Sequence, residues 1–259
     1  MRVYKGLSIV LAVVFTITSV IGGMPLFTSK AFAAPQQDAY VWDNVAIGGG
    51  GYVTGLIIHP KEKDLVYIRT DVGGAYRWEE ENKRWIPLTD WIPNSQSSLY
   101  CIDGIAVDPN NPNIVYIAAG DKKNAPSLPS DVLKSTDKGN TWTRTELNKV
   151  FSGNDSNRFV GECIAVDPNN SNIVYAGTRT DGLYRSMSAA AVNSWERVDM
   201  TTFPGGTDAT KGIRSVLFDE KSAANGMSQV IYAGVLGYGV YKTTDGGTTW
   251  SLMAGCPQN

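Results

Sequence analysis

The feature that most constrains this chain is a sequence unit that recurs along it. Residues 104–116 read GIAVDPNNPNIVY, and residues 163–175 read CIAVDPNNSNIVY. Looser copies occupy residues 55–67 and 216–232, so the unit is present four times with variable loops between the copies. A repeat of about 50 residues means that the chain builds one supersecondary unit several times and that neighbouring units bury each other.

Each repeat carries the pattern of four short strands. A β-branched run ends at a Pro/Asn turn, a run of the Ile-Val-Tyr type follows, and two more strand-like pieces flank a Gly-rich turn. Four such strands in a unit of this length are typical of a β-propeller blade. We therefore predict an all-β fold with about four propeller blades. Because propellers usually have about four to eight blades, and the sequence stops just after the fourth unit, we expect an incomplete ring.

Two repeats contain a second motif between their third and fourth strands. Residues 135–142 read STDKGNTW and residues 243–250 read TTDGGTTW, and both resemble the Asp-box of bacterial neuraminidase repeats. In such a turn the aspartate accepts hydrogen bonds from nearby backbone amides, glycine adopts positive φ, and the tryptophan packs between blades. We interpret four residues as structural on these grounds: Asp137, Trp142, Asp245 and Trp250.

Strand parity predicts which end of the blades carries the function. The turns after the first and third strands lie on one face, and the turns after the second and fourth strands lie on the other. The Asp-box turns belong to the first face. The second face carries long and varied loops, at residues 90–100, 121–130, 146–162 and 201–211. Because binding usually uses the loops of a rigid scaffold, we place the function on the second face.

Composition argues against several classes of function. The 23 basic and 25 acidic side chains give a formal charge of −2, which leaves no basic surface for nucleic acid. The lone histidine, His59, makes a Ser-His-Asp triad or a multi-histidine metal site improbable. We therefore expect no metal and no cofactor. The three cysteines are too few for a disulfide framework, so the core must hold the fold.

The amino terminus has the pattern of a secretory signal. A basic start is followed by an apolar run over residues 7–21 and by Ala31-Phe32-Ala33, the small-x-small pattern of a signal-peptidase site. The apolar run is short for a spanning helix and is followed by glycine and proline. We predict a signal peptide over residues 1–33, a partial amino-terminal β-propeller domain over residues 34–259, and a secreted protein with no membrane attachment after cleavage.

The strongest chemical signal lies on the second face of the first repeat. Residues 69–78 read RTDVGGAYRW, so that Asp71 ends the second strand before a short turn. A carboxylate held rigidly at a strand end, beside two glycines that allow close approach of a ligand, suits catalysis. From the residues alone, the interpretation that Asp71 only caps a hairpin turn is favoured.

Three segments carry a family resemblance. Residues 42–55 read WDNVAIGGGGYVTG, and together with residues 69–78 and with WIPLTDW at residues 85–91 they resemble the start of family 74 glycoside hydrolases, the xyloglucanases. The resemblance extends from Trp42 to Trp250. It implies two seven-bladed propellers that face each other across an open cleft, of which this chain would be four blades of one incomplete ring. It also implies hydrolysis of β-1,4-glucan backbones with inversion, with Asp71 as the general base.

The resemblance has consequences for the substrate and for the completeness of the site. The expected partner is a plant cell-wall polysaccharide, xyloglucan or a related β-glucan. Candidate substrate contacts on the long-loop face are Trp91, Tyr100, Arg158, Glu162 and Tyr238. In the family the general acid comes from the second propeller, so we expect this chain alone to hydrolyse xyloglucan very weakly. Three carboxyls on the same face are conceivable replacements for that acid: Asp121, Asp181 and Glu162.

Two other functions fit parts of the sequence. A non-catalytic propeller that binds carbohydrate or protein would retain Asp71 only as a turn residue. A sialidase is suggested by the Asp-boxes, but its chemistry needs an arginine cluster near a tyrosine nucleophile, and the sequence has no Arg-Ile-Pro segment. We rank the sialidase last.

Overall fold

The computed structural model describes residues 46–121, 124–198 and 212–257. The predicted signal peptide at 1–33 and the loop at 201–211 lie outside these residues, and so does the start of the motif at 42–55. No described helix is long and apolar enough to cross a membrane.

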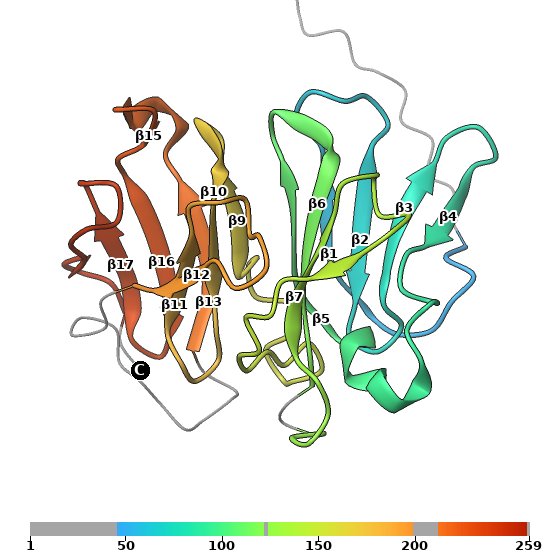
Figure 1. Ribbon diagram of the computed structural model, residues 1–259. Coiled ribbons are helices and arrows are strands. Elements are labelled where there is room, and N and C mark those ends of the chain that lie inside the picture. The colour runs from blue at the N-terminus through green and yellow to red at the C-terminus, as the bar shows by residue number, and fades with distance from the viewer. Residues whose placement is uncertain (1–45, 122–123, 199–211, 258–259) are drawn as a thin grey trace, which may run out of the picture. The chain divides into compact units, whose positions relative to one another are not determined.

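The described residues form four antiparallel sheets of four strands each, here called blades 1 to 4 (Figure 1). Blade 1 comprises β1 (Val53–Ile58), β2 (Val66–Thr70), β3 (Ala75–Glu79) and β4 (Arg84–Pro87). Blade 2 comprises β5 (Ile102–Asp108), β6 (Asn111–Ala119), β7 (Asp131–Ser135) and β8 (Thr143–Arg144). Blade 3 comprises β9 (Ile164–Asp167), β10 (Asn170–Gly177), β11 (Leu183–Ser186) and β12 (Trp195–Arg197). Blade 4 comprises β13 (Gly212–Phe218), β16 (Ile231–Leu236), β17 (Gly239–Thr243) and β18 (Ser251–Leu252). The predicted all-β fold of four propeller blades is confirmed.

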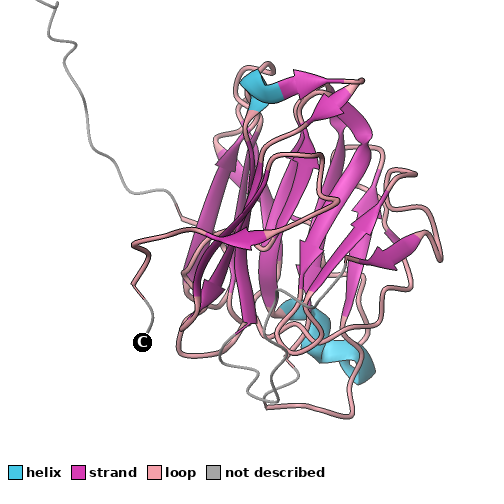
Figure 2. Cartoon of the chain, turned by 90° about the vertical axis from the view of Figure 1, so that its left-hand side faces the viewer, coloured by secondary structure: helices cyan, strands magenta, loops and turns pink. Residues whose placement is uncertain are grey.

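Four short elements of the described residues lie outside the blades. The 3-10 helix η1 (Asn94–Tyr100) connects blade 1 to blade 2. In blade 4 the turn after the first strand is not compact, because it holds the 3-10 helix η2 (Glu220–Ser222) and a small hairpin of β14 (Ala223–Ala224) and β15 (Met227–Ser228). Figure 2 shows the two 3-10 helices at opposite ends of the strands. They therefore mark the two faces that strand parity predicts.

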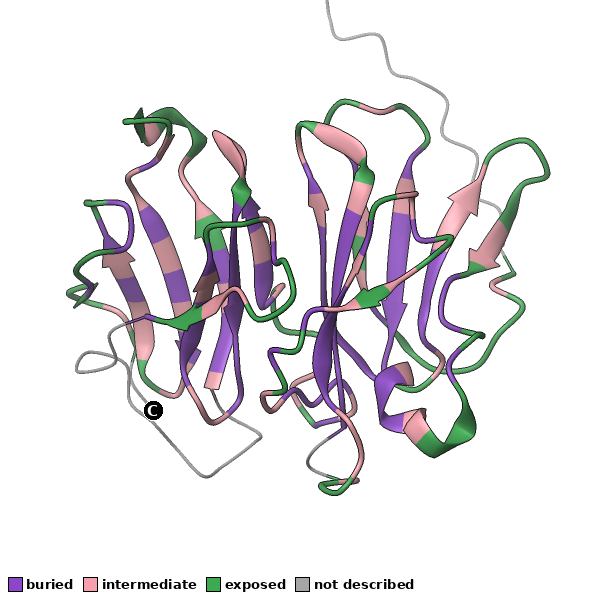
Figure 3. Cartoon of the chain, viewed as in Figure 1, coloured by how far each residue is buried: buried purple, intermediate pink, exposed green. Residues whose placement is uncertain are grey.

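The first strands of successive blades contact one another, β1 with β5, β5 with β9, and β9 with β13. Apolar side chains fill the space between each pair of blades, and Figure 3 shows these buried residues along the strands. The tyrosine of the Ile-Val-Tyr run is fully buried in three blades, and its hydroxyl donates to a carbonyl in the third-to-fourth-strand turn of the next blade. The distances are 3.4 Å from Tyr67 to Lys138, 3.2 Å from Tyr116 to Ala189 and 3.5 Å from Tyr175 to Gly246. This repeated tyrosine therefore fastens each blade to the next.

The lone histidine has a structural role in the same repeat. His59 takes the position that Asp108 and Asp167 hold in blades 2 and 3. Its Nδ1 accepts the backbone N–H of Lys61 at 3.2 Å and of Glu62 at 2.9 Å, and Nε2 lies 3.0 Å from the carbonyl oxygen of Asp108. The aspartates close their turns in the same way, with the carboxylate accepting an amide two residues on. His59 is thus a turn residue that also joins blades 1 and 2.

The two predicted Asp-box turns have closely similar hydrogen bonding. Oδ1 of Asp245 accepts the backbone N–H of Thr249 at 2.9 Å and the Thr243 hydroxyl at 2.6 Å, while Oδ2 accepts the Thr249 hydroxyl at 2.6 Å. Asp137 accepts the amide and hydroxyl of Thr141 at 2.8 and 2.6 Å. Hydrogen bonds from Thr243 and Thr249 lower the pKa of Asp245 to about 2. At Asp137 burial acts to raise the pKa. Hydrogen bonds, chiefly those from Thr141, outweigh this and lower the pKa to about 2.

The tryptophans of these turns pack between blades. Trp250 is buried in the cluster shared by blades 3 and 4, where its ring lies edge-on to Tyr175 with a centroid distance of 6.4 Å. Trp142 packs against the cluster between blades 1 and 2. Each Asp-box turn is therefore held both by its own hydrogen bonds and by its tryptophan, which packs on the core between two blades.

Blade 3 has a third turn of this kind that the sequence analysis did not single out. Oγ of Ser186 accepts the backbone N–H of Ala190 at 3.0 Å, as Oγ of Ser135 accepts that of Gly139 at 2.8 Å in blade 2. Both Ala190 and Gly139 have positive φ, at 51° and 91°. No aspartate is present, because Ser188 stands at that position. The backbone turn therefore forms without the Asp-box carboxylate.

The strand register separates the two faces. Val115 of β6 pairs with Ser135, which leads into the Asp-box of blade 2, whereas Ala119 at the other end of β6 pairs with Asp131. Asp71 follows the last residue of β2, which corresponds to the Ala119 end of β6. The prediction that Asp71 lies on the face opposite Asp137 and Asp245 is confirmed. We call these two ends the Asp71 face and the Asp-box face.

Candidate functional site

Asp71 is held by the segment that precedes the first strand. Its Oδ1 accepts the backbone N–H of Tyr52 at 2.7 Å, and its own N–H donates to the Tyr52 carbonyl at 3.1 Å. The side chain is 9% exposed. A carboxylate with so little freedom is oriented before any ligand arrives.

Two glycines allow this segment to lie against the Asp71 turn. A Cβ at Gly73 would lie 1.8 Å from the carbonyl oxygen of Gly50, and Gly51 has a φ of 98°. Neither position tolerates a larger side chain without displacing the backbone. The backbone at Gly50 and Gly51 thus lies close against the Asp71 turn.

Arg69, two residues before Asp71, is the largest fully buried side chain described. Its Nε lies 2.8 Å from Glu162 Oε1, and its terminal nitrogens donate to the carbonyls of Arg158 at 2.9 Å and Gly161 at 2.8 Å. Burial raises the pKa of the Glu162 carboxyl above its usual range, although the Arg69 guanidinium opposes this shift. Arg69 therefore fixes a loop that arrives from between blades 2 and 3 against the first blade.

That loop, residues 151–161, is here called the bridging loop. It brings Arg158 to Asp71, with Nε of Arg158 3.0 Å from Oδ2 of Asp71. This is a charge contact, because the N–H of that nitrogen is not directed for a hydrogen bond. The Arg158 guanidinium also lies 5.9 Å from the ring centroid of Tyr52. Arg158 is thus enclosed between the candidate carboxylate and an aromatic ring.

A second charged cluster fastens the other part of the bridging loop. Asp155, which is fully buried, lies 2.8 Å from Arg214 and 3.8 Å from Arg179. Asp103 pairs with Arg179 and accepts the backbone N–H of Ser152 at 3.0 Å. The two carboxylates and two guanidiniums are each nearly inaccessible to solvent. Buried charges of this kind require partners, so the cluster constrains the loop strongly.

The repeat explains how these groups come together. The residue just before the repeated first-strand pattern is polar in every blade: Thr54, Asp103, Glu162 and Arg214. In blades 1, 2 and 4 the strand register shifts at this residue, as in a β-bulge. A bulge frees a side chain from the regular alternation of the strand. One equivalent position per blade therefore delivers four different groups to the same face.

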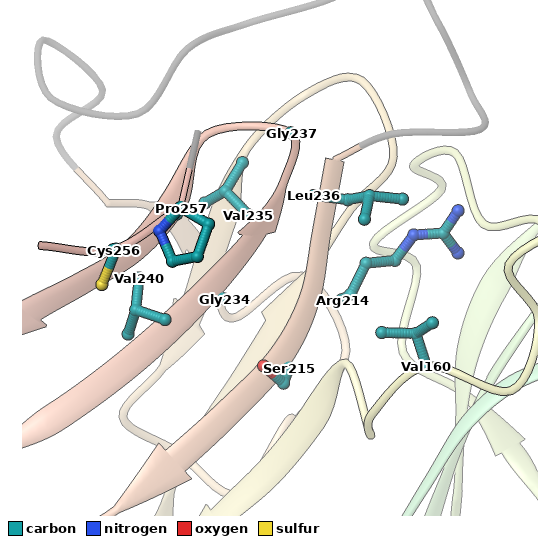
Figure 4. A pocket seen from close by; sticks show the side chains of 11 residues that line it. Val160, Arg214, Ser215, Gly234, Val235, Leu236, Gly237, Val240, Cys256 and Pro257 are labelled. Carbon is teal, nitrogen blue, oxygen red and sulfur yellow. The ribbon is translucent and has the colours of Figure 1, made fainter. Parts of the chain in front are cut away.

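A cavity of about 380 Å³ lies beside the turn that follows Asp71. The turn residues Val72 and Gly73 line it, together with the aromatic rings of Tyr76, Trp85 and Tyr100. A pocket of about 300 Å³ on blade 4 shares none of these residues and is largely apolar (Figure 4). Aromatic rings beside a carboxylate are suited to a sugar, whose apolar faces stack on them.

The predicted substrate contacts occupy different places. Tyr100 lines the cavity beside Asp71, and its carbonyl accepts the N–H of Gly74 at 2.8 Å. Trp91 is 50% exposed, and Tyr238 is 38% exposed in the turn between β16 and β17. Arg158 and Glu162 instead contact Asp71 and Arg69. The structure thus brings Tyr100, Arg158 and Glu162 to the Asp71 site, and their contact with substrate stays a prediction.

The other carboxyls considered as general acids have partners of their own. Asp121 is buried and accepts a hydrogen bond from the Asn124 amide at 2.8 Å. Asp181 lies 3.9 Å from Lys149. Among residues 46–121, 124–198 and 212–257, no group of three or more His, Cys, Asp or Glu side chains is arranged to hold a metal ion.

The sequence analysis missed the charged cluster of Asp103, Asp155, Arg179 and Arg214. Alignment of the repeats could have identified Asp103 and Arg214, because it shows a polar residue at the start of each apolar first strand. Asp155 has no such signal, because it lies in a loop whose length differs between the repeats. Arg179 stands four residues after the repeat tyrosine, as Asp71 does in blade 1, but its position does not reveal its partner. Their pairing depends on distances that only the folded chain defines.

The chain is similar to xyloglucanases over most of its length. It is 40% identical over 265 residues to a xyloglucanase of Acetivibrio thermocellus, a match that covers 96% of this chain and 30% of that protein. The solved structure of a GH74 enzyme of Niastella koreensis matches with a TM-score of 0.72 and 40% identity, covering 83% of this chain and 31% of that one. A GH74 xyloglucanase structure from Xanthomonas campestris matches with a TM-score of 0.74 and 38% identity, covering 85% and 33%. The chain thus spans about a third of the length of these relatives. No protein-family model matches it.

Proposed function

Because the chain belongs to the family 74 glycoside hydrolases, we propose that it forms part of a secreted enzyme that cleaves xyloglucan or a related β-1,4-glucan of plant cell walls. The observation that carries this proposal is the placement of Asp71. Its carboxylate is rigidly held at a strand end, and the turn that follows it lines a cavity together with Tyr76, Trp85 and Tyr100. The names of the relatives support the substrate class.

In this proposal Asp71 is the general base of an inverting reaction. The carboxylate takes a proton from a water molecule, whose oxygen attacks the anomeric carbon from the side opposite the leaving sugar. A general acid about 6.5–9.5 Å away protonates the departing oxygen. Oδ1 of Asp71 already accepts one hydrogen bond, and Oδ2 lies against Arg158, so the carboxylate is fixed while it still has lone pairs for water.

The general acid is assigned to the part of the relatives that this chain does not span. Three carboxyls near Asp71 are engaged: Glu162 with Arg69 and with the backbone of Ile105, and Asp103 and Asp155 with buried arginines. A general acid must be protonated and free to approach the substrate. Carboxyls held in such ion pairs are not free to approach it.

The test is an Asp71→Ala variant of the complete protein that carries this sequence. We expect turnover of xyloglucan to fall by at least about 100-fold, because general base catalysis contributes about 10² to 10⁴. Added azide should restore part of the rate in Asp71→Ala and give a glycosyl azide of inverted configuration, since azide needs no base. Product release and product configuration are followed by chromatography and NMR.

The matched control is Asp181→Ala, which removes an aspartate from the corresponding turn of blade 3. It should leave turnover close to that of the wild type. Full activity in Asp71→Ala, or an azide product of retained configuration, would refute the assignment. Binding of xyloglucan by a protein that never hydrolyses it would instead favour the non-catalytic carbohydrate-binding propeller.

A further inference from the structure

Buried arginines of two different blades hold the bridging loop. Arg69 binds the carbonyls of Arg158 and Gly161 from blade 1, and Arg214 of blade 4 binds the Asp155 carboxylate at 2.8 Å. Arg158 itself lies between these two attachments. The backbone on either side of it is therefore fixed to two different blades.

The attachment leaves little freedom to the Arg158 side chain as well. One terminal nitrogen donates to the carbonyl of Asp155 at 2.9 Å, and the guanidinium faces the Tyr52 ring. Nε is left 3.0 Å from Oδ2 of Asp71. The side chain is 30% exposed, and these contacts with the protein fix its position. The loop thus delivers one positive charge to the Asp71 carboxylate.

The two oxygens of Asp71 are held from opposite directions. Tyr52, in the segment before β1, donates to Oδ1, whereas Arg158, which is 87 residues further along the chain than Asp71, contacts Oδ2. Rotation of the carboxylate about its bond to the side-chain carbon would break both contacts. The Arg158 contact therefore adds a second constraint on this rotation to the one that the Tyr52 hydrogen bond provides.

We propose that Arg158 is a positioning residue for Asp71, and that the bridging loop is fastened at Asp155 and Gly161 in order to place it. This inference rests on the proposed role of Asp71 as general base. It assigns Arg158 to the orientation of the carboxylate and not to contact with the sugar. A displacement of about 1 Å at a reacting group can reduce turnover about 100-fold, so the effect of such a residue is measurable.

The experiment compares Arg158→Met with Arg158→Lys in the complete protein. Met keeps much of the side-chain length without charge, and Lys keeps a positive charge without the planar guanidinium. We expect Arg158→Met to lower kcat about 100-fold with little change in KM, and Arg158→Lys to recover part of that loss. The matched control is Arg84→Ala, an exposed arginine of β4, which should leave both constants unchanged.

A crystal structure of Arg158→Met supplies a readout that does not depend on turnover. We expect residues 155–161 to keep their backbone, because Arg69 and Arg214 still hold them, while the Asp71 carboxylate turns away from its present orientation. A kcat within twofold of the wild type, a loss confined to KM, or an unchanged carboxylate would overturn the proposal. So would a shift of the whole loop, because the loss would then be structural.

The outcome for Asp71 separates the two proposals. If Asp71→Ala is inactive and Arg158→Met is fully active, only the positioning role fails. If Asp71→Ala is fully active, the general base assignment fails, and the orientation of the carboxylate in Arg158→Met alone decides whether Arg158 positions it.

Discussion

The Asp-box turns and the Asp71 face hold their carboxylates in opposite ways. On the Asp-box face, Asp245 bonds only to residues two to four positions along its own turn. On the Asp71 face, the partners are far apart in sequence: Arg69 and Glu162 are separated by 93 residues, and Arg214 and Asp155 by 59. The Asp-box carboxylates therefore use local turn chemistry, whereas the Asp71 face uses charge pairs that exist only when several blades have assembled.

This difference predicts how each face responds to substitution. A local turn loses a few hydrogen bonds with its own backbone, and the rest of the fold is unaffected. A buried charge pair that loses one member leaves the other charged and unsolvated. Substitutions on the Asp71 face should therefore have the larger effects on the free energy of unfolding.

The largest effect is expected from Arg69→Met. It leaves Glu162 without its charge partner and frees the carbonyls of Arg158 and Gly161, so the free energy of unfolding should fall by about 3–5 kcal/mol. Urea denaturation measures the change. The double variant Arg69→Met/Glu162→Gln should recover part of the loss. A loss below about 1 kcal/mol in the single variant would show that the pair is not a buried, coupled unit.

Gly55→Ala should have the next largest effect. A Cβ at Gly55 would lie 2.6 Å from both Arg69 Nε and Glu162 Oε1, so the added methyl group must push the ion pair apart. Overpacking of this kind costs about 1–3 kcal/mol. Gly50→Ala is the matched control, because its Cβ would meet no atom within 4 Å. Equal thermal stability of the two variants would contradict the close packing described for Arg69.

Asp245→Asn tests the Asp-box face and its dependence on pH. The pKa of Asp245 is lowered from 3.8 to about 2, so its carboxylate stabilises the fold fully above about pH 4 and loses this contribution as the pH falls towards 2. At pH 7 the variant should be less stable by about 1 kcal/mol, the size of a net hydrogen bond. Thermal unfolding at pH 7, 4 and 2 should show the difference shrinking with acidity. A difference that stays constant with pH would exclude the carboxylate charge as its source.

The smallest effect is expected from Arg84→Ala. Arg84 lies 2.6 Å from Glu79, and hydrogen bonds from Arg84 and Asn82 lower the pKa of Glu79. Both side chains of the pair are well exposed, so solvent and salt screen their attraction. Thermal unfolding of Arg84→Ala and wild type should coincide in 0.5 M salt. A clear loss of stability at that salt concentration would mean that this exposed ion pair contributes to the free energy of unfolding as a buried pair does.

The same contrast explains what the sequence could predict. Blade number, strand order and the opposite placement of Asp71 and Asp137 follow from a repeat whose turns are local. The blade 3 turn was missed because Ser188 replaces the aspartate that identifies an Asp-box, although Ser186 keeps the backbone hydrogen bond. The ion pairs of Arg69 and Arg214 were not predictable, because loops of different length carry their partners. Arg158 and Glu162 were singled out by resemblance, but their contacts with Asp71 and Arg69 depend on the folded path of the bridging loop.

The polar position at the start of each first strand has a consequence for how such proteins diversify. A duplicated repeat starts with identical neighbours, and most of its residues are committed to ladders and to the cores between blades. Thr54, Asp103, Glu162 and Arg214 stand at an equivalent position where the copies differ in charge, and the strand pairing continues beyond it. Substitutions at this position give each blade a different side chain, so that blades with the same backbone present different charges. Gene duplication provides repeats with the same backbone, and the residue at this one position then differs in charge from blade to blade.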